Sequence, residues 1–147
     1  MSDRYLMIPA TLMDDEEITD IGPRAAALFV AMLCRCRMLS TDGWLTQAQV
    51  AALGHPSWRR DVAKMIGVGL VTEHPTALSK RAYYLPMFLR YNPSQAFYRQ
   101  SSAAGTVANC ERRWHHPQPC FRPKCLEARS ILARSVPDSG TESVPGS

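Results

Sequence analysis

The residues best suited to chemistry lie near the C-terminus, between residues 110 and 125. Three cysteines and two adjacent histidines occur there: Cys110, His115, His116, Cys120 and Cys125. Zinc takes four Cys or His ligands in a tetrahedron, and short loops between the ligands cost little to close. We therefore expect a Zn²⁺ site whose ligands are Cys110, His115 or His116, Cys120 and Cys125. The C-x4-C spacing departs from the usual C-x2-C pair, so the alternative is a basic segment with unpaired thiols.

The same segment could place a cysteine nucleophile beside a base. Cys120 is close in sequence to both histidines, and Glu111 is the nearby acid that could orient one of them. Such a catalyst also needs a preformed pocket. The sequence has no phosphate-binding loop, no carboxylate pair on one helix face and no metal-hydrolase signature. We therefore expect a protein without enzymatic activity.

A second group of residues suits contacts to nucleic acid. Arginine can bond two acceptors of guanine at once, whereas lysine and helix-capping N–H groups suit phosphate. The candidate residues fall in the first turns of two predicted helices, and in and directly after a predicted loop. The alternative is that they are ordinary solvated side chains. The residues expected to contact DNA are Gln47, Gln49, Ser57, Arg59, Arg60, Lys64, Ser79, Lys80 and Arg81.

The charge of the chain is unevenly distributed. The 147 residues include 17 basic and 13 acidic side chains, which gives a net charge of +4. Residues 1–20 have a net charge of −5, residues 21–135 of +11, and residues 136–147 of −2. A basic body behind an acidic segment suits a polyanionic partner, although many soluble proteins are as basic as this one.

Apolar periodicity predicts a long first helix. It should begin after Gly22, with Pro23 at an early position where a missing N–H is harmless, and end near Ser40. The acidic residues 14–17 before it are expected to form a solvated turn, and residues 5–8 an edge strand. The apolar stripe of this helix consists of Ala25, Leu28, Phe29, Met32, Leu33 and Cys36.

Two shorter helices should follow a short strand at residues 44–45. Thr46 and Gln49 have the spacing of a capping box and would open the second helix, which Gly54 stops. Ser57 would cap a third helix running to about Val68. Its inward stripe is expected to contain Trp58, Val62, Met65 and Ile66.

Residues 70–74 and 81–85 read as two strands joined by a turn-rich connector. The resulting order is helix, strand, helix, helix, strand, loop, strand. That order predicts an α+β, mainly α protein: a winged helix-turn-helix of three helices and a small antiparallel sheet, with an added C-terminal helix. In such proteins the start of the third helix meets base edges in the major groove.

The chain divides into three predicted regions. Residues 1–91 form the winged helix-turn-helix domain, and residues 92–126 a C-terminal helix with the Cys/His-rich segment. Asn92 and Pro93 would open that helix, which could reach Ser102 and resume after Gly105. Residues 127–147 are expected to be a disordered tail rich in Ser, Pro and Gly.

The sequence also predicts a cytoplasmic protein. Its five cysteines are an odd number without a disulfide pattern, its start does not resemble a secretory signal, and no apolar run is long enough for a membrane span.

Several motifs resemble the small winged helix-turn-helix DNA-binding proteins of actinobacterial phages and prophages. They are Gly69-Leu70-Val71 after the third helix, the junction Phe88 to Ser94, Trp44 after Asp42-Gly43, and Arg113-Trp114-His115 before cysteines. The resemblance spans about residues 4–125. It implies a phage DNA-binding protein related to the N-terminal modules of replication-initiation proteins, or to small regulators. The prolines Pro119 and Pro123 and a less basic C-terminal helix depart from that pattern.

Two functions from different classes therefore remain open. The first is non-catalytic binding of double-stranded DNA in phage replication initiation or transcription regulation. The second is a protein-interaction module that assembles replication or transcription proteins without reading DNA, through the acidic residues 14–20 or the C-terminal helix. A homodimer is a further expectation, through Phe97 and Val107 of the C-terminal helix.

Overall fold

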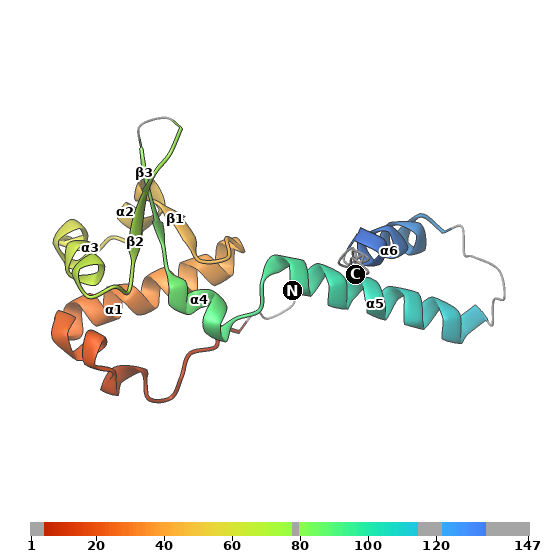
Figure 1. Cartoon of the computed structure of the whole chain (residues 1–147), viewed down its shortest axis with the longest axis horizontal. Coiled ribbons are helices and arrows are strands. Elements are labelled where there is room, and N and C mark those ends of the chain that lie inside the picture. The colour runs from red at the N-terminus through yellow and green to blue at the C-terminus, as the bar shows by residue number, and fades with distance from the viewer. Residues whose placement is uncertain (1–4, 78–79, 115–121, 135–147) are drawn as a thin grey trace, which may run out of the picture. The chain divides into compact units, whose positions relative to one another are not determined.

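The computed structural model describes residues 5–77, 80–114 and 122–134. The chain divides into two compact units, residues 1–95 and residues 96–147, and each is described by itself (Figure 1). The elements of the first unit are η1 (Leu12–Asp14), α1 (Glu16–Leu39), β1 (Trp44–Thr46), α2 (Gln47–Ala51), α3 (Trp58–Gly67), β2 (Thr72–Pro75), β3 (Arg81–Tyr84) and α4 (Pro86–Tyr91).

The described strands form one antiparallel sheet in the order β1–β3–β2. Tyr84 of β3 pairs with Trp44 on one side and with Thr72 on the other, which fixes the register of all three strands. β2 and β3 form a hairpin that projects from the helices (Figure 1). Helices make up most of the described chain, so the predicted α+β, mainly α class with a small antiparallel sheet is confirmed.

The core of the first unit lies where α1 packs against α3 and the sheet. Every residue of the apolar stripe predicted for α1 is buried, as are Val62 and Met65 of α3. Leu45 and Tyr83 add the inner face of the sheet to the same cluster. Full burial of one such side chain contributes about 1.5–3 kcal/mol, so this stripe is what holds α3 in place.

The start of α1 differs from the prediction. The helix begins at Glu16, and Gly22 interrupts it with φ of 83° and ψ of 166° before Pro23. The predicted solvated turn over residues 14–17 is therefore wrong at Glu16 and Glu17, which form the first helical turn. Carboxylates at a helix N-terminus are stabilised by the helix dipole, and burial of Ile18 and Ile21 holds the extra turn against the core.

The edge strand predicted for residues 5–8 is also wrong. Met7 pairs not with a described strand but with the buried side chain of Asn92. The Met7 N–H donates to Oδ1 of Asn92 at 2.8 Å, and Nδ2 of Asn92 donates to the Met7 carbonyl at 2.8 Å. One amide side chain thus replaces the hydrogen bonds that a neighbouring strand would supply.

The contacts of Asn92 also explain where the first unit ends. Asn92 does not open the C-terminal helix as predicted, because it is the C-terminal cap of α4, a short helix that the sequence does not predict. α5 instead begins at Gln95, whose N–H donates to Oδ1 of Asp42 at 2.9 Å. The predicted domain boundary at residue 91 falls at the end of α4, whereas the first unit extends to Gln95.

The second unit consists of the two helices α5 (Gln95–Trp114) and α6 (Pro123–Arg134) in its described part. α5 continues through Gly105 without the predicted break. Ala103 of α5 is buried, as are Cys125 and Ala128 of α6. α6 covers residues 127–134, where the disordered tail is predicted to start, and the rest of that tail lies outside the described residues.

Candidate nucleic-acid interface

The inner face of α3 is fixed by an ion pair as well as by apolar packing. Asp61 is 1% exposed, and its carboxylate accepts two hydrogen bonds from Arg24 of α1. Nε donates to Oδ2 at 3.2 Å and Nη2 to Oδ1 at 3.0 Å, the two-pronged geometry in which Arg holds a carboxylate best. The Arg24 side chain is 59% exposed, so water solvates the cation while the protein buries the anion. This pair was not predicted from the sequence, although Asp61 lies three residues after Trp58 and four before Met65 of the predicted inward stripe.

The outer face of α3 carries the predicted DNA-contacting cations. Arg59, Arg60 and Lys64 are all exposed, as predicted for an outward face. The Arg59 guanidinium lies 5.2 Å from the ring centroid of Trp58. Trp58 is half-buried, and its ring meets Tyr83 edge-on at 6.5 Å. Trp58 therefore contributes to the core as predicted and also supports Arg59 from beneath.

The residues between these cations on the outer face of α3 have small side chains. Ala63 and Gly67 are exposed and follow Arg59 at intervals of four residues, so the three lie in one row along the helix. Arg60 and Lys64 form the neighbouring row. A helix face with small residues between cations can approach a groove floor closely, and an alanine methyl suits contact with the methyl group of thymine. Ala63 and Gly67 were not predicted as site residues, although helical spacing alone could have found them.

The residues predicted on α2 are engaged within the protein. Gln49 completes the predicted capping box: its N–H donates to Oγ1 of Thr46 at 3.2 Å, and its side-chain oxygen accepts from the Thr46 N–H at 2.9 Å. Gln47 is half-buried, and its Nε2 donates to the hydroxyl of Tyr83 at 3.5 Å. Ser57 precedes α3 but makes no side-chain cap. Gln47 thus ties α2 to β3 and Gln49 caps α2, whereas the prediction that Ser57 caps α3 is wrong.

The β2–β3 hairpin holds further basic residues. Lys80 is exposed, and its carbonyl accepts hydrogen bonds from the backbone and hydroxyl of Thr76, which close the loop. Arg81 is exposed and pairs with Glu73 at 2.9 Å across the two strands. Ser79 lies outside the described residues. Lys80 is therefore better placed than Arg81 for a free phosphate contact.

The outer face of the sheet supports this hairpin with aromatic rings. The ring of Trp44 lies 4.9 Å from that of Tyr84 and 5.1 Å from that of His74. Aromatic pairs across strands stabilise a sheet beyond their buried area. The base of the hairpin is consequently tied to β1.

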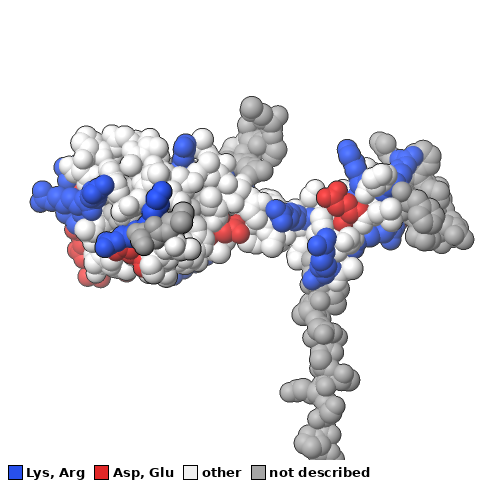
Figure 2. All heavy atoms as spheres, turned by 90° about the horizontal axis from the view of Figure 1, so that it is seen from above, with Lys and Arg blue, Asp and Glu red and all other residues white. Residues whose placement is uncertain are grey.

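Figure 2 shows how the charges of the first unit are distributed. Lys and Arg side chains gather at the end where α3 lies in Figure 1 and around the tip of the hairpin. The visible face of this unit therefore presents several basic side chains. Such a face would concentrate positive potential towards a polyanion.

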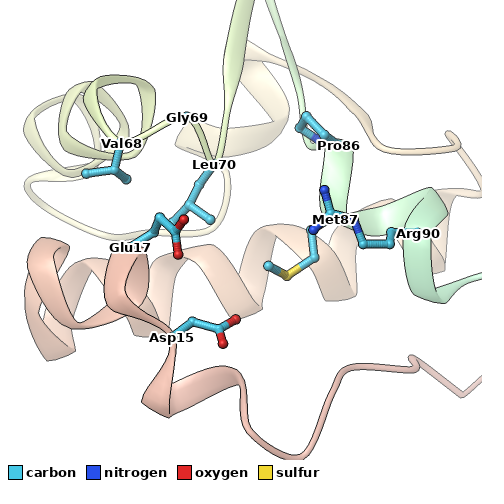
Figure 3. A pocket seen from close by; sticks show the side chains of 8 residues that line it. All are labelled: Asp15, Glu17, Val68, Gly69, Leu70, Pro86, Met87 and Arg90. Atoms are coloured by element: carbon cyan, nitrogen blue, oxygen red, sulfur yellow. The ribbon is translucent and has the colours of Figure 1, made fainter.

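A pocket of about 130 Å³ lies at the other end of α3. Figure 3 shows the carboxylates of Asp15 and Glu17 on one side and Arg90 on another, with Leu70 and Met87 between them. Its lining contains no Cys, His, Ser or Thr. The pocket adjoins the turn after α3 and not the Arg59 end, so it is separate from the cationic face.

The predicted zinc ligands are only partly described. Cys110 of α5 is half-buried and Cys125 of α6 is buried, whereas His115, His116 and Cys120 lie outside the described residues. Among the residues that the structure places, there is no group of three or more potential metal ligands. The zinc site therefore stays a prediction from the sequence.

The two cysteines of α1 are expected to differ in reactivity. Burial raises the pKa of the Cys36 thiol from 9.0 to about 11, whereas Cys34 is exposed. Because the thiolate is the nucleophile, iodoacetamide at pH 8 should alkylate Cys34 in the folded protein and spare Cys36. A chymotryptic digest with fragment sequencing by mass spectrometry measures both sites, and urea-unfolded protein serves as the control. Equal labelling of both sites in the folded state would contradict the expectation.

No protein-family model, curated protein or solved structure matches the chain. Within the described residues, no helix combines the length and apolar character needed to cross a membrane.

Proposed function

We propose that the first unit is a winged helix-turn-helix that binds double-stranded DNA without catalysis. In this assignment α2 and α3 form the helix-turn-helix, α3 is the recognition helix, and the β2–β3 hairpin is the wing. The order of elements and the sheet order β1–β3–β2 support it. The protein would insert the outer face of α3 into the major groove, while the wing approaches the backbone.

The observation that carries this proposal is the composition of the outer face of α3. Arg59 and Arg60 occupy its first turn, where recognition helices contact base edges, and Lys64 lies one turn further. The inner face is held by the pair of Asp61 with Arg24 and by apolar packing. A helix whose backbone is already held in place loses little backbone freedom on binding, which favours specific contacts.

The biological role proposed for this binding is phage replication initiation or transcription regulation. Support for it comes from the sequence resemblance to small phage winged-helix proteins. We also propose that the protein acts in the cytoplasm of the host cell.

A protein-interaction module is the second candidate. The observation that favours it is the pocket between the start of α1 and α4, which could accept one side chain of a partner. In that case replication or transcription proteins would be the partners, and the cations of α3 would not contribute.

A salt titration of duplex binding separates the two candidates. We expect full-length protein to bind a labelled mixed-sequence duplex in fluorescence anisotropy, with a log–log slope against salt of about −4 to −5. Each phosphate contact contributes about −0.9 to that slope, so the value corresponds to about five contacts. Absence of binding even at low salt would refute the DNA proposal and favour the protein-interaction module.

A further inference from the structure

The second unit holds a larger share of the positive charge than its size suggests. Residues 96–147 contain seven basic and four acidic side chains, a net charge of +3, whereas residues 1–95 contain ten basic and nine acidic ones, a net charge of +1. The overall basicity of the chain therefore comes mainly from α5, α6 and their connection.

Few of these basic side chains take part in the contacts between the two helices of this unit. Arg129 of α6 pairs with Glu111 of α5 at 3.4 Å. Cys125 and Ala128 of α6 and Ala103 of α5 are buried. The described contact between the helices thus involves one ion pair, and Arg99, Arg112 and Lys124 stay exposed to solvent.

The exposed cations are spread around the unit. Arg99, Arg112 and Lys124 are exposed and make no ion pair within the described residues. On α5, Arg112 lies thirteen residues after Arg99, which places them on different sides of the helix. In Figure 2 the Lys and Arg side chains of this unit surround one small group of acids. This distribution suits the uniform charge of a phosphate backbone better than a shaped ligand.

We propose that the α5–α6 unit is a second nucleic-acid contact, which binds the phosphate backbone without reading sequence. The inference rests on the proposed function of the first unit, since the same duplex would engage both. Counterion release from the contacted phosphates would supply the affinity, while α3 would supply the sequence preference.

The test compares two sets of full-length variants by anisotropy over a salt series. One duplex carries a site that the unaltered protein has enriched from random-sequence DNA (the selected duplex), and the other is the mixed-sequence duplex. Replacing Arg99, Arg112 and Lys124 with glutamine should reduce the salt slope by about 0.9 for each phosphate contact that is lost, and by at least that amount in total. The ratio of affinities for the two duplexes should stay unchanged. Replacing Arg59 and Arg60 with alanine should instead reduce that ratio.

Two controls keep the result interpretable. The control for Arg112→Gln is Arg90→Gln, which removes an exposed arginine of α4. Only Arg112→Gln should change the salt slope. Arg99→Lys with Arg112→Lys should retain the slope, and circular dichroism verifies the helices of every variant.

The proposal would be overturned if the triple variant kept the full slope. A slope that falls with the triple variant, together with an affinity ratio that the α3 variant leaves unchanged, would support the second contact and refute α3 as the recognition helix. The opposite result would refute the second contact and leave the proposed function standing. Absence of duplex binding would refute both.

Discussion

Replacing Arg59 and Arg60 together with alanine is expected to weaken binding to a selected duplex by at least about 30-fold. Each arginine that contacts a guanine edge contributes about 1–3 kcal/mol of discrimination, and 1.4 kcal/mol corresponds to a tenfold change in affinity. Both side chains are exposed, so their removal should leave the free energy of unfolding nearly unchanged. The selected site should then bind no better than mixed DNA. Anisotropy titrations on both duplexes measure the effect.

A charge-matched pair controls for the loss of net charge. Arg60→Ala should weaken binding and relax sequence preference, whereas Arg90→Ala, also an exposed arginine of the first unit, should do neither. Lys64→Ala should weaken binding to all sequences alike, as expected for a phosphate contact. Equal losses from Arg60→Ala and Arg90→Ala would mean that α3 makes no special contribution.

Replacing Arg24 with alanine is expected to destabilise the first unit by about 3 kcal/mol. The substitution leaves the carboxylate of Asp61 buried without its partner. Breaking a fully buried pair costs about 3–5 kcal/mol, and the exposure of Arg24 places this pair at the lower end of that range. Because the Arg24 side chain is 59% exposed, the reverse substitution Asp61→Ala should cost less, about 1 kcal/mol. Urea unfolding followed by circular dichroism gives both free energies.

The double variant completes a double-mutant cycle for Arg24 and Asp61. Arg24→Ala with Asp61→Ala should be more stable than Arg24→Ala alone, because it removes the buried charge as well as its partner. Arg24→Ala should also weaken DNA binding at temperatures where the native protein is still folded, since α3 loses its tie to α1. Additive losses in the double variant would show that the two side chains contribute independently.

The elements of the first unit were predictable where local pattern and packing agree. The stripe of α1, the capping box at Thr46 and the strand at Trp44 each follow from residues close in sequence, and all three are confirmed. The exposed positions of Arg59 and Arg60 follow from the same helical periodicity. Whether they contact DNA stays a prediction.

The features that the sequence did not reveal depend on contacts between distant residues. Asn92 has the local signature of a helix cap, yet its side chain binds Met7, 85 positions away in the sequence. Asp61 has the type of a surface residue and becomes buried only because Arg24 of another helix neutralises it. α4 is only six residues long, which is too short for apolar residues to recur at helical spacing. Periodicity in the sequence therefore could not predict it.

The measurement that tests DNA recognition by α3 most directly is amide chemical-shift mapping by NMR on addition of a duplex. We expect the largest shifts in residues 57–67 and in the hairpin around Lys80, with Ala63 and Gly67 among them and the pocket residues Asp15 and Glu17 unaffected. Shifts confined to α1, α4 and that pocket, with residues 57–67 unchanged, would contradict recognition of DNA by α3.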